Sequence, residues 1–565
     1  MATELDQMLD RIMDALSAEG QPFETTMTER RGQPMPAFRN APPSLAHYFA
    51  HYCKEHGDTT FLVDGDVRLS FAESYAAARA VASGLISRHG LERGDRVGIA
   101  ARNSASWIIA YMGIVMAGGC ATLLNGFWNG DELAYGIRLA ECKYVLADRQ
   151  RAERLVGTDH SATILPLVHD CHPLEGLAAL CGEAGAADAA LPELGPDDLA
   201  TILYTSGSTG LSKGAWSDHR GVVSGTMSYA AQTLMALTYL DGKGEAPTLQ
   251  PCALVAVPLF HVTGEVPLFL QSFALGRKLV ILKRWDALEA LRLMEAEKVT
   301  YFVGVPLMSY EIATHPDRAK FDISACSGFA AGGAPRPPDH VSKIRDSFPD
   351  GFPLIGYGLT ETNAVGCANF NENYLAKPTS TGRSSRPIVE LAIMDEAGNK
   401  LAQGATGEIC IRSVANFSGY WNNDEATSAA FTADAFFRTG DLGYIDEDGY
   451  LFIVDRKKDI IIRGGENISC IEVEEAFYAR EEIAECSVFG LPHERYGEIP
   501  AAVYFVKPGA NFPEEMLVEH LKASLAPFKV PTVLWRSDQP LPRLGTQKID
   551  KRSLREHYVK VTAGA

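Results

Sequence analysis

The chain has 565 residues, of which 46% are hydrophobic and 22% charged, and its formal net charge is −19. This length is too great for one hydrophobic core, so we expect two or more domains. The composition is that of a globular protein, and the negative charge argues against nucleic acid or an anionic membrane as a general partner. The eleven cysteines include no Cys-x-x-Cys pair, which predicts neither a zinc site nor disulfides and favours a cytoplasmic location.

The first part of the chain predicts an amphipathic helix and then an α/β domain. Leucine, isoleucine and methionine recur at helical spacing over residues 5–16. Beyond them, helical patterns alternate with short apolar runs at 61–63, 97–100, 121–124 and 144–147. This alternation is typical of mainly parallel sheets covered by helices.

Residues 106–124 carry no charge and are similar in length and apolar character to a transmembrane helix. Gly118 and Gly119 interrupt it, and glycine commonly follows the C-terminus of a helix. We therefore predict a helix followed by a buried strand, and no transmembrane segment.

A glycine- and hydroxyl-rich segment follows a predicted strand at 199–204, and it reads Thr-Ser-Gly-Ser-Thr-Gly-Leu-Ser-Lys-Gly over residues 205–214. Glycines let backbone N–H groups converge on an anion, hydroxyls add donors, and lysine adds a positive charge. The Walker pattern fails, because Ser212 and Gly214 flank the lysine where glycine and a hydroxyl residue are required. The segment indicates a phosphate-binding loop of another kind, with a plain surface loop as the alternative.

The second half of the chain predicts two further units. Strands are expected at 254–257, 278–282 and 300–304, and shorter strands separated by turn dipeptides follow. A charged break at 455–459 precedes an independent α+β pattern. We therefore predict an N-terminal domain over 1–457, whose region 380–457 is a small β-rich lobe, and a mobile C-terminal domain over 458–565.

Five motifs follow the phosphate loop in order. They are residues 357–362 (Tyr-Gly-Leu-Thr-Glu-Thr), 438–441 (Arg-Thr-Gly-Asp), 455–459 (Asp-Arg-Lys-Lys-Asp), 463–467 (Arg-Gly-Gly-Glu-Asn) and 541–551, which ends Gln-Lys-Ile-Asp-Lys. In this order and spacing they resemble the adenylate-forming superfamily, which includes acyl-CoA synthetases, adenylation domains of peptide synthetases and luciferases. The resemblance covers nearly the whole chain from Pro42 on. Taken singly, most of these residues would be interpreted as ordinary surface residues. Only their occurrence together, in this order and spacing, favours a functional site.

The resemblance implies that a carboxylate attacks the α-phosphorus of ATP to form an acyl-adenylate, which a thiol then consumes. Catalysis of this kind depends on positioning and on stabilising negative charge. The implied ATP-binding residues are Thr205, Ser206, Gly207, Ser208, Thr209, Gly210, Lys213, Gly333, Ala334, Tyr357, Asp441 and Arg456.

Four residues are expected at the reacting atoms. The resemblance implies that Thr360 donates to the α-phosphate, that Glu361 helps to hold Mg²⁺, and that Lys548 bridges the carboxylate and the α-phosphate. His261, in an apolar run, is either a site residue beside the acyl carboxylate or a hydrogen-bonded core histidine.

The second half-reaction requires Lys548 to leave, which the superfamily achieves by rotating its C-terminal domain. The resemblance places the hinge at Lys458, and a hinge consists of few residues that absorb a large backbone change. Gly464 and Gly465 provide a backbone without side chains, past which the narrow arm of CoA could reach the site.

The predicted acyl pocket is apolar, which favours a fatty acid or a bulky alicyclic, aryl or steroid acid over acetate or an amino acid. Its expected lining residues are Val262, Gly264, Phe302, Gly304, Phe329 and Ile355. Few residues follow Lys548, so free CoA is the expected acceptor. The alternatives are transfer to a separate carrier protein and a non-catalytic nucleotide-binding role. A homodimer is a further possibility that the sequence does not decide.

Three positions depart from the superfamily pattern. Gln547 replaces a common glycine before the lysine, and Leu544 replaces a common threonine. Ile355 replaces a polar residue and makes the predicted pocket wall more apolar.

Overall fold

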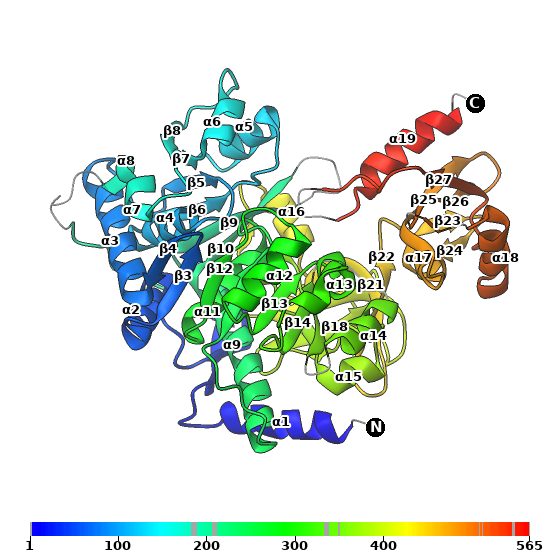
Figure 1. Cartoon of the computed structure of the whole chain (residues 1–565), viewed down its shortest axis with the longest axis horizontal. Coiled ribbons are helices and arrows are strands. Elements are labelled where there is room, and N and C mark those ends of the chain that lie inside the picture. The colour runs from blue at the N-terminus through cyan, green and yellow to red at the C-terminus, as the bar shows by residue number, and fades with distance from the viewer. Residues whose placement is uncertain are drawn as a thin grey trace.

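The computed structural model describes residues 3–181, 189–205, 212–332, 338–348, 351–507, 509–510, 512–544 and 548–563. Figure 1 shows a large α/β body and, beside it, a smaller lobe formed by the last part of the chain. The predicted fold class is confirmed, because the large body contains mainly parallel sheets and an α+β unit follows it.

Within the described residues, the first large sheet has seven strands in the order β20-β10-β9-β6-β5-β7-β8. The five strands from β9 to β8 are parallel, and β10 and β20 extend the sheet in antiparallel fashion. The bounds are β5 (Arg96–Ala100), β6 (Cys120–Leu123), β7 (Tyr144–Ala147), β8 (Thr163–Pro166), β9 (Leu199–Thr205), β10 (Lys213–Asp218) and β20 (Gly419–Tyr420).

The second large sheet has nine strands among the described residues, in the order β17-β16-β15-β14-β13-β11-β12-β3-β4. The strands from β15 to β3 are parallel, and those at the two edges are antiparallel. The bounds are β3 (Thr60–Asp64), β4 (Val67–Ser70), β11 (Cys252–Val255), β12 (Lys278–Ile281), β13 (Tyr301–Gly304), β14 (Gly328–Gly332), β15 (Phe352–Tyr357), β16 (Cys367–Asn369) and β17 (Arg383–Ser384).

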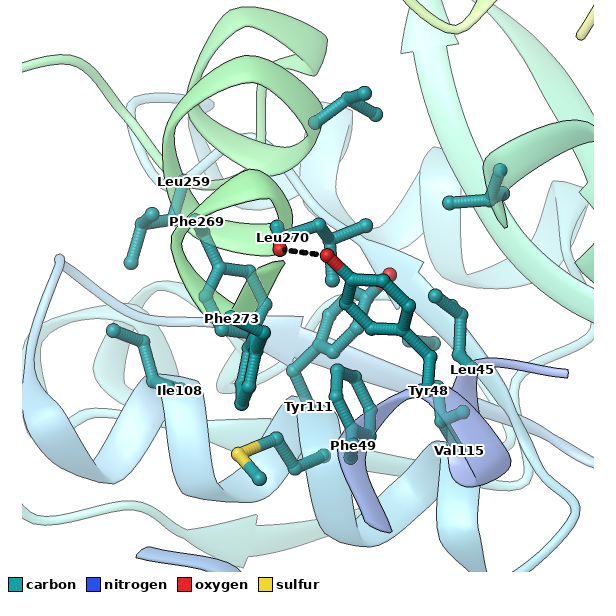
Figure 2. Close-up of a cluster of buried hydrophobic side chains, with 14 of the residues drawn as sticks. Leu45, Tyr48, Phe49, Ile108, Tyr111, Val115, Leu259, Phe269, Leu270 and Phe273 are labelled. Atoms are coloured by element: carbon teal, nitrogen blue, oxygen red, sulfur yellow. Dashed lines mark hydrogen bonds between the residues drawn. The ribbon is translucent and has the colours of Figure 1, made fainter. Parts of the chain in front are cut away.

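One buried cluster contains residues of both large sheets and of the helices packed against them. Figure 2 shows its aromatic centre, where Tyr48 and Phe49 lie close to Tyr111 and Phe273. The hydroxyl of Tyr48 donates to the carbonyl oxygen of Leu270 at 2.9 Å, so this buried polar atom is satisfied. Each fully buried side chain of this size stabilises the fold by about 1.5–3 kcal/mol.

The helices of the large body that contribute to this cluster or lie near it are α2 (Leu45–His56), α3 (Phe71–Ser87), α4 (Ala105–Met116), α7 (Pro173–Gly176), α8 (Ala178–Cys181), α9 (His219–Gly242), α10 (Val262–Gly264), the π-helix η1 (Glu265–Leu270) and α11 (Gln271–Ala274). A second cluster covers the other face of the nine-stranded sheet with α12 (Ala287–Ala296), α13 (Pro306–Thr314) and α14 (Pro338–Ser347). Outside these layers lie α5 (Gly130–Leu139), α6 (Arg149–Leu155), α15 (Asn371–Ala376), α16 (Asp424–Ala429) and the hairpin of β1 (Thr25–Arg30) and β2 (Gln33–Phe38).

The apolar stretch over 106–124 folds as predicted. Helix α4 ends at Met116, Gly118 takes a positive φ of 82°, and β6 begins at Cys120. Every residue of α4 is buried, which explains why the helix carries no charge. Within the described residues, none of the helices has the length and apolar character that spanning a membrane requires.

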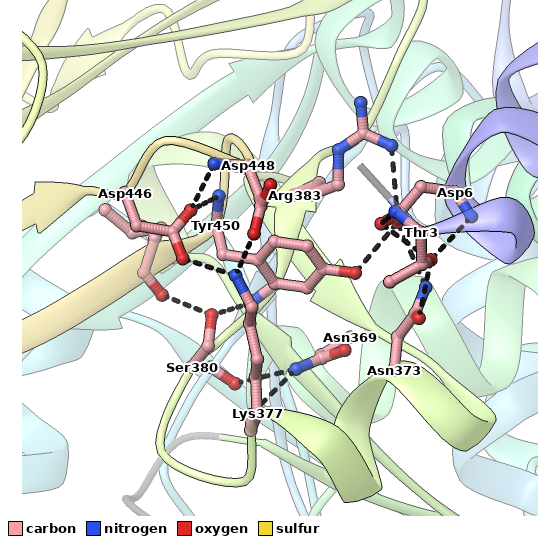
Figure 3. A network of polar contacts seen from close by, with 12 residues as sticks. Thr3, Asp6, Asn369, Asn373, Lys377, Ser380, Arg383, Asp446, Asp448 and Tyr450 are labelled. Carbon is pink, nitrogen blue, oxygen red and sulfur yellow. Dashed lines mark hydrogen bonds and ion pairs between the residues drawn. The ribbon is translucent and has the colours of Figure 1, made fainter. Parts of the chain in front are cut away.

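The β-rich lobe is a four-stranded antiparallel sheet within the described residues, formed by β18 (Val389–Met394), β19 (Gly407–Ser413), β21 (Phe437–Ile445) and β22 (Leu451–Arg456). The predicted N-terminal helix is α1 (Glu4–Leu16), and it reaches this lobe. Figure 3 shows the contact: Asp6 accepts hydrogen bonds from Tyr450 at 2.8 Å and from Asn373 at 3.0 Å.

The C-terminal unit begins after β22 and has two apolar clusters of its own. Its elements are β23 (Ile461–Arg463), β24 (Glu466–Ile468), β25 (Ile483–His493), β26 (Gly497–Val506), β27 (Val533–Ser537), α17 (Cys470–Tyr478), α18 (Glu514–Ser524) and α19 (Lys551–Ala563). The predicted domain boundary at 457/458 falls between β22 and β23, and the boundary itself stays a prediction.

Candidate active site

The predicted phosphate loop joins two antiparallel strands of the seven-stranded sheet. Thr205 ends β9 and pairs with Lys213, which begins β10. The Lys213 ammonium lies 4.7 Å from the centre of the Tyr420 ring. Five predicted ligands of the loop (Ser206, Gly207, Ser208, Thr209 and Gly210) and two of the adenine site (Gly333 and Ala334) lie outside the described residues.

Glu361 lies buried beside this lysine. It belongs to the short helix η3 (Thr360–Thr362), which Thr360 begins, and its carboxylate accepts a hydrogen bond from the hydroxyl of Tyr420 at 2.8 Å. Burial raises the pKa of Glu361, and the charges of Arg456 and Lys213 act in the opposite direction. The arrangement predicts a carboxylate that gains stability from a bound cation.

Tyr420 is a site residue that the sequence analysis missed. It lies in β20, at the edge of the seven-stranded sheet, and contacts both Glu361 and Lys213. The pairing of β20 with β10 is what places Tyr420 next to Lys213 and Glu361.

Tyr357, Asp441 and Arg456 meet as predicted, although they come from different sheets. The hydroxyl of Tyr357, at the end of β15, donates to Asp441 of β21 at 2.7 Å. Arg456 faces Asp441 across the β21–β22 pair, with its Nε 3.4 Å from the carboxylate. Burial raises the pKa of Asp441, while Arg456 and the Tyr357 hydroxyl favour its ionised form. A buried carboxylate held in this way has lone pairs available to accept hydrogen bonds from a ribose.

Lys548 of the C-terminal unit lies at this site, partly buried. Its pKa is lowered to about 8, chiefly by burial and also by the charge of Arg456, while Asp441 acts in the opposite direction. The lysine therefore lies within electrostatic range of two predicted ATP ligands. Its neighbour Gln547 lies outside the described residues, and Leu544 is 43% exposed with its N–H bonded to the Lys548 carbonyl at 2.8 Å.

His261 faces the same lysine. Burial, together with the positive charge of Lys548, lowers the pKa of His261 to about 3. The Nδ1 atom of His261 accepts the backbone N–H of Thr263 at 3.3 Å, at the start of α10. The histidine is thus a neutral side chain within electrostatic range of Lys548, and its place beside the acyl carboxylate stays a prediction.

The predicted acyl-pocket residues divide between the two faces of the nine-stranded sheet. Val262 belongs to the same buried cluster as Ala330, on the side of His261. Phe302 and Phe329 are fully buried in the other cluster, beneath α12–α14, so the structure does not bring them together with His261. Side chains alternate between faces along a strand, and the prediction had not assigned the faces.

Of the remaining pocket residues, Gly264 ends α10, Gly304 ends β13 and Ile355 lies within β15. A Cβ atom on Gly264 would lie 2.3 Å from the carbonyl oxygen of Pro258, and one on Gly304 would lie 3.0 Å from the Phe302 ring, so both glycines permit close packing. Ile355 is buried in a small cluster with Val341 and Tyr374.

Two paired glycines lie close to Thr263. Gly332 and Gly356 pair across β14 and β15. A Cβ atom added to Gly332 would find its nearest neighbours, the carbonyl oxygen of Gly356 and the methyl group of Thr263, at 3.8 and 4.0 Å. A Cβ atom at Gly332 would therefore be in ordinary van der Waals contact with these two atoms.

The predicted hinge and CoA glycines lie next to each other in the C-terminal unit. Lys458 is exposed between β22 and β23. Gly464 and Gly465 form the β23–β24 turn with positive φ of 61° and 94°, a conformation that glycine adopts without strain. A Cβ atom at Gly465 would meet nothing within 4 Å, whereas one at Gly464 would lie 3.4 Å from the Tyr496 ring.

The fold defines an adenylate-forming ligase, in which a smaller α+β unit follows a large α/β body. Residues 49–421 match the family model described as AMP-binding enzyme, and residues 472–548 match the AMP-binding enzyme C-terminal domain. The chain belongs to the AMP-binding enzyme family, in its acyl-CoA synthetase branch, and ATP and CoA are the nucleotide substrates of that branch.

Two relatives illustrate the branch. The chain is 32% identical to a long-chain-fatty-acid–CoA ligase of Bacillus subtilis, over 84% of this chain and 88% of the relative. It is 30% identical to the 3-[(3aS,4S,7aS)-7a-methyl-1,5-dioxo-octahydro-1H-inden-4-yl]propanoyl:CoA ligase of Rhodococcus jostii, over 89% and 96% of the two chains.

A solved structure also bears on the arrangement of the chain. MatB from Rhodopseudomonas palustris is 31% identical, with coverage of 91% of this chain and 99% of MatB. The TM-score is 0.80 against the ATP-bound form and 0.69 against the apo form. The arrangement described here therefore resembles ATP-bound MatB more closely.

Proposed function

We propose that the chain activates a hydrophobic carboxylic acid as its acyl-adenylate and transfers the acyl group to free CoA. The observation that carries the proposal is the position of Lys548, which lies within electrostatic range of both His261 and Asp441. An ammonium group beside a ribose-binding carboxylate and a neutral histidine suits a reaction in which negative charge develops on phosphate and carboxylate oxygens.

In the first half-reaction, a carboxylate oxygen of the acid attacks the α-phosphorus of ATP. The bond between the α-phosphorus and the bridging oxygen breaks, and pyrophosphate leaves with the electron pair. In the second, the sulfur of CoA attacks the acyl carbonyl, AMP leaves, and the thiol proton passes to solvent or a base. In both steps the protein contributes position and charge stabilisation.

We assign roles to residues within this scheme. Lys548 binds the oxygens of the reacting carboxylate and α-phosphate, and Thr360 donates to the α-phosphate. Asp441 accepts hydrogen bonds from the ribose hydroxyls, and the face of the Tyr357 ring packs against adenine. Neutral His261 orients the acyl carboxylate, since its low pKa leaves it without charge at neutral pH.

Mg²⁺ is part of the proposal, with Glu361 as its protein ligand. One oxygen of this buried carboxylate bonds to Tyr420, and a bound cation would balance its charge. No group of three or more His, Cys, Asp or Glu side chains within the described residues could hold a metal. This fits Mg²⁺, which usually takes one or two carboxylates together with substrate phosphates. The ion would neutralise charge on the triphosphate.

The proposed acid is a medium- or long-chain fatty acid or a bulky alicyclic, aryl or steroid acid. The support is the apolar wall that contains Val262, together with the acids named for the two relatives. Burial of apolar substrate surface contributes about 25 cal/mol per Å², which favours a large hydrophobic acid.

The test is a screen with Mg²⁺, ATP, CoA and three acids, namely dodecanoate, cinnamate and a steroid carboxylate, with acetate as the control. We expect AMP and an acyl-CoA ester with at least one of the three and little of either with acetate. AMP without any CoA ester would indicate a carrier protein as the acceptor, and ATP binding without AMP would indicate a nucleotide sensor. Either result would contradict the proposal.

The cytoplasmic location and the homodimer stay predictions. Light scattering after size-exclusion chromatography would decide the second, with a mass near twice 61.2 kDa expected for a dimer.

A further inference from the structure

A buried aspartate connects the last strand of the β-rich lobe to the first helix of the C-terminal unit. Asp455 lies in β22, three residues before the predicted hinge, and is 2% exposed. Its carboxylate accepts the backbone N–H groups of Cys470, through a short hydrogen bond, and of Ile471, at 3.4 Å. Both donors belong to the first turn of α17, beyond the hinge.

A second hydrogen bond crosses the hinge at the same place. The hydroxyl of Ser469, the N-cap residue of α17, donates to the carbonyl oxygen of Val454 at 2.8 Å. The lobe therefore satisfies the N-terminus of α17 from outside the C-terminal unit. A carboxylate at this end of a helix gains both from the free N–H donors and from the helix dipole.

The charges around Asp455 link this contact to the catalytic lysine. Burial raises the pKa of Asp455, and the positive charge of Lys551 acts in the opposite direction. Lys551 begins α19, three residues after Lys548, and its ammonium lies 3.0 Å from Glu474 of α17. Helix α17 thus contains the two backbone N–H groups that bind Asp455. It also contains Glu474, whose ion pair with Lys551 holds the chain three residues after Lys548.

Rotation about Lys458 would move α17 away from β22. Asp455 would then lose its two donors from α17 and keep the backbone N–H of Arg456 at 2.6 Å, and a buried carboxylate pays a free-energy cost for each partner that it loses. The contact consequently favours the arrangement described here, in which Lys548 lies beside His261 and Asp441.

We propose that Asp455 is a positioning residue for the first half-reaction: its bond to the N-terminus of α17 holds the C-terminal unit where Lys548 reaches the adenylation site. The inference rests on the proposed function, because it assumes two half-reactions with different positions of that unit. Beyond that function, the inference names the contact between Asp455 and α17 as one that favours the first of these two positions.

The test compares the two half-reactions in Asp455→Asn. Adenylation is measured by pyrophosphate exchange, and thioester formation by mixing the synthetic acyl-adenylate with CoA, using the acid that gave most AMP in the screen above. We expect adenylation to fall about fivefold, the factor that loss of a helix cap of about 1 kcal/mol produces. Thioester formation should be unchanged or faster.

Glu472→Gln is the matched control. Glu472 lies in the first turn of the same helix, but its carboxylate pairs with Lys529 inside the C-terminal unit, at 2.6 Å. Both half-reactions should keep their wild-type rates. Ser469→Ala, which removes the second bond across the hinge, should shift the ratio in the same direction as Asp455→Asn and serves as the test if the asparagine variant does not fold.

Equal effects on both half-reactions, in a folded Asp455→Asn or in Ser469→Ala, would overturn the inference. Wild-type rates in both half-reactions of these variants would overturn it as well. The wild-type protein is measured first in each assay. A wild type without either half-reaction would refute the proposed function, whereas an active wild type with an unshifted ratio in the variants would refute only the role of Asp455.

Discussion

Lys548 lies close enough to His261 that its charge, together with burial, keeps the histidine neutral. The two residues come from different units of the chain, since His261 precedes α10 and Lys548 precedes α19. A neutral histidine within electrostatic range of an ammonium group suits a site that phosphate and carboxylate anions enter. This relationship gives the site a defined dependence on pH.

Adenylation should decline in alkaline solution. The pKa of Lys548 is lowered to about 8 from 10.5, chiefly by burial, so the ammonium loses its proton as the pH rises through 8. We expect kcat/KM for ATP in the first half-reaction to fall above about pH 8, because this parameter reports ionisations of the free enzyme. With a pKa of about 3, His261 should add no change between pH 5 and 8.

Lys548→Arg provides the control for this pH profile, because arginine keeps its charge above pH 12. The alkaline decline of adenylation should disappear in this variant, even if the absolute rate is lower. Thioester formation from supplied acyl-adenylate should lack the decline in the wild type. A decline of the same midpoint in Lys548→Arg would assign it to another group.

Removal of the Tyr357 hydroxyl should weaken ATP binding. Tyr357→Phe takes away the 2.7 Å hydrogen bond to buried Asp441 and leaves that carboxylate with one donor fewer. The cost of about 1–1.5 kcal/mol corresponds to a roughly five- to tenfold higher KM for ATP. Tyr504→Phe removes a similar 2.8 Å bond, to Glu514 of the C-terminal unit, and should leave this KM unchanged. Equal effects of the two variants would count against the nucleotide site.

A bulky residue in the β23–β24 turn should block CoA selectively. Gly465→Leu adds a side chain where a Cβ atom meets nothing within 4 Å, so the turn has room for it in this arrangement. Adenylation should stay within about threefold of wild type, and thioester formation should fall at least tenfold, about 1.4 kcal/mol. Gly509→Leu places the same side chain at another positive-φ glycine with open surroundings and controls for backbone strain. An unchanged thioester rate in Gly465→Leu would exclude the proposed CoA path.

The network in Figure 3 should contribute to stability rather than to chemistry. Asp6→Ala leaves the Tyr450 hydroxyl and the Asn373 amide without their buried acceptor. We expect a cost of roughly 2–3 kcal/mol in urea unfolding of the large body. Asp14→Ala removes only an exposed ion pair with Arg386 and should cost at most about 1 kcal/mol. Comparable losses in the two variants would show that the network adds little.

Local patterns in the sequence predicted the elements well, and the structure shows why. The apolar runs at 97–100, 144–147 and 199–204 became β5, β7 and β9, because each is buried and bounded by polar residues. Gly118 marked the end of α4 because it takes a left-handed conformation in the three-residue connection to β6, which glycine adopts without strain.

The predicted site was less complete, and the omissions have a common physical cause. Tyr420 reaches Glu361 only because β20 pairs with β10 across the phosphate loop. Phe302 and Phe329 were assigned to the acyl pocket from their types, but strand direction and sheet coverage decide which face a side chain occupies. Both facts depend on pairing between distant segments, which no local pattern contains.

The most direct test of the account is the effect of Lys548→Ala on each half-reaction, measured with the acid that gives most AMP in the screen. Pyrophosphate exchange should fall about 100- to 1,000-fold, as for removal of a charge-stabilising donor, while thioester formation from the synthetic acyl-adenylate and CoA stays within about threefold of wild type. If adenylation survives the substitution, or if both half-reactions fall together, Lys548 does not have the role on which the proposed function depends.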